Sequence, residues 1–270
     1  MKQLVRRLST TLLVTITIIA VLVLWEVLVR LLDIPMYLVP PPSAVFKETL
    51  RLGPELLRHT WVTFYEIVIG FLISVVLGVP IGILIVYSPW LEQVSYVLLV
   101  ISQAVPKVAL APLFLVWLGF GMQTIVLLTF LISFFPIVVN TVVGMRSIAP
   151  EMLLLAKAMK ATQLQTFAIF RLPVALPSIF GGLKVASTLA VVGAIVAEFV
   201  GSQEGLGYLI LSANANFQTP LAFAAIAILS LMGLAIFYFI AFLENRVVFW
   251  QRSNELEPEA WQRASVGVDL

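Results

Sequence analysis

The sequence predicts an all-α membrane protein whose chain crosses the bilayer six times. Of its 270 residues, 61% are hydrophobic and only 11% are charged, and the mean hydropathy is +1.08. Soluble domains carry about 25% charged residues, so a water-soluble fold would lack the polar side chains to cover so much apolar surface. Six apolar stretches are each long enough to cross roughly 30 Å of hydrocarbon as a helix of about 20 residues. These observations exclude a soluble enzyme.

The six predicted spans cover residues 10–32, 62–87, 94–118, 123–144, 180–200 and 221–243. The first has no small-residue cleavage site and is too long for a removable signal peptide. Between the first two spans, three consecutive prolines predict an extended segment. The helical spacing of Val45, Leu50 and Leu52 then predicts a short surface helix on the outer side.

The distribution of cations predicts the orientation of the chain. With the N-terminus in the cytoplasm, ten Lys and Arg residues lie on the inner side and three on the outer side. Because cytoplasmic loops carry an excess of Lys and Arg, we expect both termini in the cytoplasm. The chain then divides into a cytoplasmic N-terminus of residues 1–9, a transmembrane domain of residues 10–250 and a polar cytoplasmic tail of residues 251–270.

The sequence gives no support for catalysis, a metal site, a cofactor or nucleic-acid binding. It contains no cysteine and a single histidine, which exclude thiolate sites and a histidine metal cluster. We expect that histidine, His59, to be solvated in an outer loop. The G-x-x-x-x-G-K-[S/T] motif, which holds the phosphates of ATP, is absent from the sequence. The net charge of +2 comes from scattered cations rather than from a basic block, so it does not indicate nucleic-acid binding.

The loop between the fourth and fifth spans, residues 145–178, is named here the coupling loop. It contains the segment EMLLLAKAMKATQLQTFAIFRL, whose three cations and two glutamines disfavour a membrane span. A helix would place Met152, Leu155, Ala156 and Met159 on one face and two lysines on another. Such an amphipathic helix either docks a partner or only tethers the two spans along the membrane surface.

The end of this segment carries a motif. The segment ends with Phe170, Leu172 and Pro173, followed by V-A-L-P. This ending and the spacing before it resemble the cytoplasmic loop of ATP-binding-cassette importer permeases. The pattern of that loop is E-A-A, three residues, Gly, nine residues and then I-x-L-P. The spacing is kept, whereas the Glu and the Gly are replaced. Because Gly tolerates a positive φ and Lys does so poorly, Lys160 weakens the expectation of a tight turn. We expect the residues at the matching positions, together with the neighbouring Lys157, to couple the permease to the ATPase. They are Leu154, Leu155, Ala156, Lys157, Lys160, Phe170, Leu172 and Pro173.

The resemblance extends over residues 10–250. Three further segments, VPPPSAV (39–45), PKVALAPLFLVWLGFG (106–121) and AEFVGSQEGLGYLI (197–210), are similar to permeases of the nitrate, sulfonate and taurine importer group. The last looks most like members that serve riboflavin or pyrimidine precursors of thiamine, with sulfonates and taurine next.

The resemblance implies the type I importer permease fold in the lipid of the plasma (inner) membrane. It also implies three protein partners. A separate cytoplasmic ATPase receives the coupling helix in a cleft, a second permease chain completes the pathway, expected as a homodimer, and an extracytoplasmic solute-binding protein delivers the substrate.

Three polar residues near or within spans are candidates for the transport pathway. Lys107 lies between two prolines within the third span, and a cation at bilayer depth faces a cavity or the protein interior; it either lines the pathway or supports a broken helix. Asn140 has the same ambiguity. Glu198 either lines the outer mouth or accepts backbone hydrogen bonds from the glycine-rich loop after the fifth span, the role that we favour.

The second span repeats a small residue at every fourth position: Gly70, Ser74, Gly78 and Gly82. Such a face lets another helix approach closely. The neighbour is either a helix of the same chain or one of a second chain.

Two other functions remain open at this stage. An ion-driven secondary transporter needs intramembrane carboxylates and often inverted repeats, but only Glu66 and Glu198 approach that description and no clear repeat is present. A membrane scaffold without transport activity is the weakest alternative.

Overall fold

The computed structural model describes residues 2–88, 90, 91, 93, 101 and 105–250, with side chains described from residue 12 onward. The predicted tail of residues 251–270 and the first part of the predicted third span lie outside the described residues. In the described part of the chain the secondary structure is helical, without a strand.

Within the described residues, five helices are long and apolar enough to cross a membrane. They are α1 (Lys2–Leu31), α3 (Gly53–Tyr87), α6 (Met122–Arg146), α9 (Leu172–Gly201) and α11 (Thr219–Val247). Of the predicted third span, the described part is a 3-10 turn, η1 (Lys107–Leu110), followed by α5 (Ala111–Leu118). The structure therefore describes five of the six predicted spans as continuous helices.

The helices are longer than the apolar stretches that predicted them. The second predicted span begins at residue 62, but α3 begins at Gly53; the fifth begins at residue 180, but α9 begins at Leu172. Polar residues at a helix end can stay helical outside the hydrocarbon, so hydropathy underestimates helix length.

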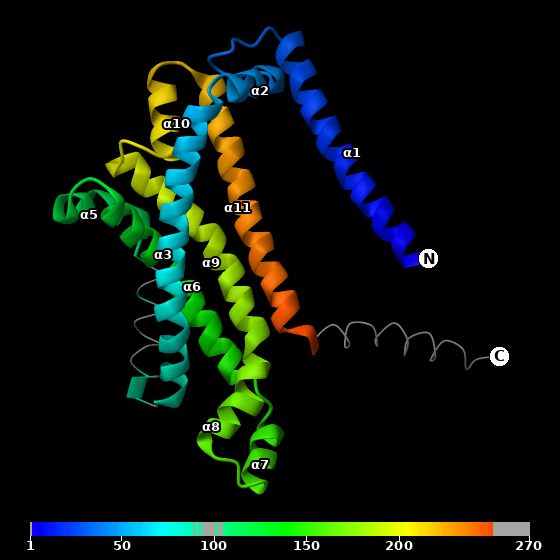
Figure 1. Cartoon of the computed structure of the whole chain (residues 1–270), viewed down its shortest axis with the longest axis vertical. Helices are drawn as coiled ribbons and strands as arrows, with labels where there is room; N and C mark the ends of the chain where they lie inside the picture. Colours follow the sequence, from blue (N-terminus) through cyan, green and yellow to red (C-terminus); the bar gives the residue numbers. More distant parts are fainter. Residues whose placement is uncertain (1, 89, 92, 94–100, 102–104, 251–270) are drawn as a thin grey trace.

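Helices α3, α6 and α9 form the centre of the molecule, with α6 packed against both of the others (Figure 1). Their shared core contains Ile67, Ile125, Leu128, Ala190 and Ala194, all fully buried. The short α10 (Leu206–Ala215) and the long α11 cover this core from one side.

The small-residue face of α3 is covered by α6 of the same chain. A Cβ atom added to Gly70 would lie 2.6 Å from Thr129 Cβ, and one added to Gly82 would lie 2.6 Å from Thr141 Cβ. Between them, the Ser74 and Ser133 hydroxyl oxygens are 2.8 Å apart. Glycine is therefore needed at these crossings because any side chain would force the helices apart, and the face is not available to a second chain.

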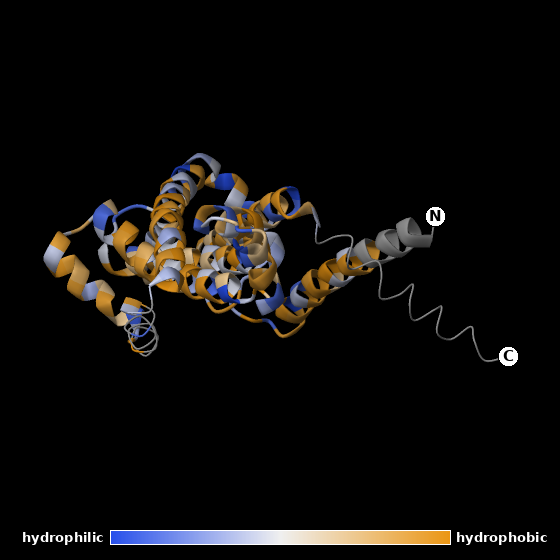
Figure 2. Cartoon of the chain, turned by 90° about the horizontal axis from the view of Figure 1, so that it is seen from below, coloured by the Kyte–Doolittle hydropathy of each residue, from blue (hydrophilic) through white to orange (hydrophobic). Residues whose placement is uncertain are grey.

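Most of helix α1 stands apart from the bundle (Figure 1). Toward its end it contacts α2 (Pro42–Arg51), and Trp25 lies 5.7 Å from Phe223 of α11, measured between ring centroids. The Glu26 carboxylate accepts hydrogen bonds from the Ser43 amide (3.0 Å) and hydroxyl (2.8 Å) at the start of α2, and it also pairs with Arg30. Viewed from below, the helix leading to the N-terminus is predominantly hydrophobic (Figure 2), and most of its described side chains are exposed. Such a surface requires lipid or protein around it.

At the end of the bundle opposite α2 and α10, the coupling loop projects beyond the long helices (Figure 1). It contains α7 (Pro150–Ala158), α8 (Gln163–Gln165) and the π-helix η2 (Thr166–Arg171), which leads directly into α9.

Candidate functional site

The turn of the coupling loop adopts the conformation that glycine usually provides. Lys160 has φ of +52°, its amide donates to the Lys157 carbonyl (3.0 Å), and the Ala161 amide donates to the Ala156 carbonyl (3.0 Å). This is a Schellman motif, in which a left-handed residue ends a helix. The lysine therefore keeps the tight turn, at the cost of a backbone conformation that side chains disfavour.

A capping box starts the next helix immediately after this turn. The Thr162 hydroxyl accepts a hydrogen bond from the Gln165 amide (3.3 Å), and the Gln165 side chain accepts one from the Thr162 amide (2.8 Å). These reciprocal bonds satisfy two amides that would otherwise lack partners. The turn and the capping box together fix the end of α7 relative to the start of α8.

The predicted ATPase-coupling residues divide into an outward and an inward group. Four are exposed on α7 and its turn: Leu154, Leu155, Lys157 and Lys160. The other four lie at the base of the loop, where Ala156 is fully buried and Phe170, Leu172 and Pro173 are half-buried. Of the four residues predicted to share one face of this helix, Met152, Leu155, Ala156 and Met159, only Ala156 is buried, because the short helix packs only a narrow row of residues against its neighbours.

The described part of the chain contains a hollow of about 500 Å³ near the middle of the bundle, named here the central hollow. Lys107, at the start of η1, places its Nζ 4.5 Å from the centre of the Phe135 ring on α6. The lining residues are Val105, Lys107, Val108, Ile132, Phe135, Pro136, Val139, Asn140, Leu189 and Val192. The structure thus places Lys107 and Asn140, which are distant in sequence, in the wall of one hollow.

Asn140 is oriented by its own helix and by α9. Its Nδ2 donates to the Pro136 carbonyl (2.8 Å), one turn earlier in α6. A Cβ atom on Gly182 would lie 2.5 Å from Asn140 Cβ, so glycine lets α9 approach this side chain. The amide group is therefore held at the wall of the central hollow.

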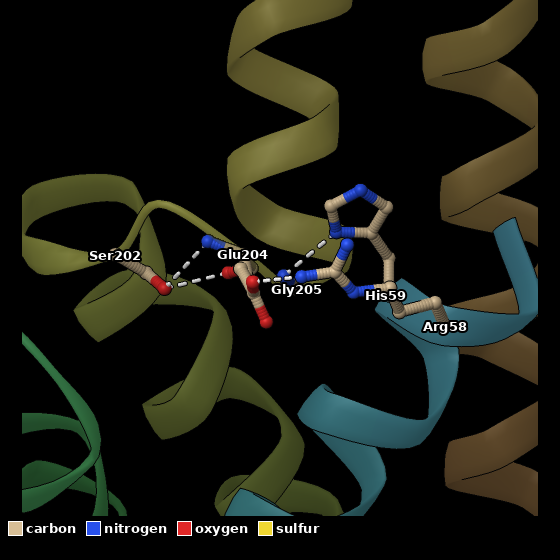
Figure 3. Close-up of polar contacts among 5 residues, drawn as sticks. All are labelled: Arg58, His59, Ser202, Glu204 and Gly205. Atoms are coloured by element: carbon tan, nitrogen blue, oxygen red, sulfur yellow. Dashed lines mark hydrogen bonds and ion pairs between the residues drawn. The ribbon is translucent and has the colours of Figure 1, made fainter. Parts of the chain in front are cut away.

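A set of polar contacts, some buried and some exposed, anchors the glycine-rich loop between α9 and α10 to α3. The His59 Nδ1 accepts a hydrogen bond from the Gly205 amide (3.0 Å), and Arg58 pairs with Glu204 (Figure 3). The expectation of a solvated His59 is wrong: the ring is almost fully buried, because the loop folds back over α3.

Glu198 lies inside this network and is 1% exposed. Its carboxylate accepts hydrogen bonds from the Thr63 hydroxyl (2.6 Å) and the Gly207 amide (2.5 Å), while the Leu206 amide donates to the Thr63 hydroxyl (2.7 Å). We name His59, Thr63 and Glu198 the loop-anchoring network. This is the geometry expected for orienting the loop, and Glu198 does not line the central hollow.

Sequence reasoning missed His59 and Thr63. The available signal was their spacing, because His59, Thr63 and Glu66 fall on one face of α3. All three are buried in the structure.

Residues 74–249 match the family described as "Binding-protein-dependent transport system inner membrane component". The chain belongs to this permease family. The match begins within α3 and spans α6, α9, α10 and α11, the central hollow and the whole coupling loop.

Curated relatives cover most of the permease. It is 38% identical over 241 residues to the formylaminopyrimidine transport permease protein ThiX of Halalkalibacterium halodurans, covering 89% of this chain and 96% of the relative. It is 38% identical to the riboflavin transport system permease protein RibX of Chloroflexus aurantiacus, covering 88% and 90%. A putative aliphatic sulfonates transport permease protein SsuC of Bacillus subtilis is 34% identical, with coverage of 87% and 86%.

The fold of the permease resembles that of a solved transporter chain. A chain of the MetNI methionine ABC transporter in an inward-facing conformation aligns with a TM-score of 0.62 and 19% identity, covering 73% of this permease and 96% of that chain. At this identity the likeness concerns the fold alone.

These matches confirm the class predicted from sequence: an all-α, multi-pass membrane permease of an ATP-driven, binding-protein-dependent importer. They decide against the ion-driven secondary transporter and the inert scaffold. The relatives differ in the substrates that their names state, so family membership leaves the solute of this permease open.

Proposed function

We propose that the permease works as a homodimer in the lipid of the plasma membrane, with residues 1–9 and 251–270 in the cytoplasm. Two cytoplasmic ABC ATPase subunits dock on the coupling loops and hydrolyse the ATP. An extracytoplasmic binding protein delivers the solute at the opposite end, which carries α2 and α10. The transmembrane domain of residues 10–250 then passes the solute through its pathway.

The observation that carries this proposal is the apolar surface of the projecting coupling loop. Leu154 is 65% exposed, Leu155 53%, Met159 67% and Leu164 74%. Exposed leucines and methionines gathered on a projecting element are typical of a protein-binding surface. The loop projects from the end of the bundle (Figure 1), where a cytoplasmic partner would reach it.

The loop is connected to the spans in a way that suits the transmission of movement. On one side, the buried Ala156 ties α7 into the base of the loop. On the other, η2 continues into α9 without a break, and α9 supplies Leu189 and Val192 to the central hollow. A π-helical turn is rare and is found frequently at functional sites, so we infer that η2 absorbs part of the motion when the ATPases close.

The central hollow supplies the polar residues proposed for the pathway, Lys107 and Asn140. Glu198 is proposed to hold the outer loop in place. Relatives are named for the transport of formylaminopyrimidine, riboflavin, aliphatic sulfonates and taurine, so we infer that the solute is a small organic compound of the riboflavin or pyrimidine type, or a sulfonate such as taurine.

The experiment compares single aspartate substitutions on two surfaces. The permease is co-expressed with its ATPase, purified in mild detergent, and analysed for retained ATPase. Leu154→Asp should lose most of the ATPase and still insert into the membrane, because a carboxylate in an apolar contact is poorly solvated. The matched control is Leu50→Asp, at a residue of similar exposure (67%) on α2, which should retain the ATPase.

Charge reversal tests the lysines of the same surface. Lys157→Glu should weaken ATPase retention, whereas Lys47→Glu on α2 should not. Full ATPase retention by both Leu154→Asp and Lys157→Glu would place the contact elsewhere. ATP-independent uptake by a preparation without any ATPase would refute the importer function itself.

A further inference from the structure

In the described part of the chain, Lys107 has no acidic partner, unlike Arg30 and Lys184. Arg30 pairs with Glu26, and Lys184 Nζ lies 2.7 Å from the Glu244 carboxylate. Among the residues that the structure describes, no carboxylate lies within ion-pair distance of Lys107. Its interaction is with the face of the Phe135 ring, 4.5 Å away.

The depth of this lysine in the membrane raises the free-energy cost of leaving its charge without an acidic partner. Phe135 lies near the middle of α6, so the ammonium group is at the depth of the hydrocarbon centre. A cation at this depth is retained where it faces a cavity or a partner charge. An aromatic ring attracts an ammonium group but carries no net charge, so no described residue neutralises the positive charge at the wall of the central hollow.

The other walls of the central hollow favour the organic part of a small solute. Apart from Lys107 and Asn140, the lining side chains are apolar. Asn140 uses its Nδ2 on the Pro136 carbonyl, which leaves its carbonyl oxygen as an acceptor for a solute hydroxyl or amine. The volume of about 500 Å³ lies within the range of small-molecule sites, about 300–1,000 Å³.

We propose that the central hollow binds the transported solute through an anionic oxygen group, a sulfonate, carboxylate or phosphate, that pairs with Lys107. The organic part of the solute packs on the valine and leucine walls, and Asn140 contacts a neutral polar group of it. This inference rests on the proposed function as an importer and narrows its substrate class to organic anions. Lipid headgroups are a second source of anionic oxygen, but they lie at the bilayer surface, far from the middle of α6.

The test uses the complete importer, with its ATPases and binding protein, reconstituted in vesicles of phosphatidylcholine, which supply no anionic lipid. ATP-driven uptake is measured for butanesulfonate, taurine, butyrate, riboflavin and riboflavin 5′-phosphate. The last two share one body and differ by the phosphate, so they isolate the effect of the charge. We expect uptake of at least one anionic probe, and riboflavin 5′-phosphate to be preferred over riboflavin if either is carried.

Variants of Lys107 then test the residue. Lys107→Met should lower kcat/KM for the anionic probe at least tenfold, which corresponds to about 1.4 kcal/mol, and Lys107→Arg should retain most of it. The matched control is the double variant Lys184→Met with Glu244→Gln, which removes a paired lysine without leaving a net charge. If Lys107→Met does not assemble with the ATPase, Lys107→Gln replaces it as a polar, uncharged variant.

The outcomes separate this inference from the proposed function. ATP-driven uptake of riboflavin alone, uptake of no anionic probe, or full anion uptake by both Lys107→Met and Lys107→Gln would overturn the anion site and leave the importer function standing. Failure of the permease to assemble with any ATPase would instead overturn the proposed function.

Discussion

Replacing Glu198 by alanine should release the glycine-rich loop from α3. In the structure the Glu198 carboxylate accepts hydrogen bonds from the Thr63 hydroxyl and the Gly207 amide. Both donors are buried, and an alanine side chain offers no acceptor to either of them. We therefore expect the variant to insert into the membrane with its loop loosened.

The magnitude follows from the two donors. A buried donor left without a partner costs about 1–3 kcal/mol, so two give a total of roughly 2–6 kcal/mol, less whatever water recovers at the open loop. Glu198→Gln keeps one acceptor oxygen and its shape, and it should cost about half as much.

The assay is hydrogen exchange of the amides of Gly205, Leu206 and Gly207 in the detergent-purified permease, with thermal unfolding measured in parallel. Exchange at these amides should be at least tenfold faster in Glu198→Ala than in the wild type. Glu48→Ala is the control, because Glu48 forms an ion pair with Arg51 on α2 and surface pairs contribute about 0–1 kcal/mol. Unchanged exchange in Glu198→Ala together with lost solute uptake would refute the anchoring role and place Glu198 in the pathway.

Three further substitutions test local features of the structure. Gly82→Ala should destabilise the α3–α6 contact by about 1–3 kcal/mol, because its Cβ would meet Thr141; Gly181→Ala, with open space around it, should leave the melting temperature unchanged or raise it. Lys160→Gly should stabilise the coupling-loop turn by about 1 kcal/mol, seen as slower amide exchange in α7, and faster exchange would show that the left-handed turn is not populated. Lys184→Met should lower the stability by about 1–3 kcal/mol, because it leaves Glu244 unpaired in a partly buried site. Thermal melts should show recovery when Glu244→Gln is added; no recovery would mean that the pair contributes little.

The class of the protein could be predicted from the sequence because lipid imposes simple rules. A helix must satisfy its own backbone groups in the bilayer, so apolar stretches such as residues 123–144 identify spans directly. The coupling loop was also recognisable, since its motif depends on spacing along one continuous segment. The predicted turn at Lys160 was uncertain from sequence because side-chain type alone does not fix φ, and the structure shows that neighbouring hydrogen bonds hold it at +52°.

The residues that meet across helices could not be predicted. His59 looks like a solvated loop residue in the sequence, yet the Gly205 amide donates to it after a loop about 145 residues away folds onto α3. Similarly, nothing local to Gly70 says whether its close neighbour belongs to the same chain, whereas the structure places Thr129 of α6 against it.

The sequence by itself determined that the chain lies in the membrane and which loop resembles a coupling element, because hydropathy and motif spacing are properties of contiguous residues. Only the tertiary structure decided that Lys107 and Asn140 share one hollow while Glu198 is tied to the outer loop. The physical reason is that helix crossings, set by glycines and small side chains on facing helices, bring together residues whose separation along the chain carries no information about their distance in space.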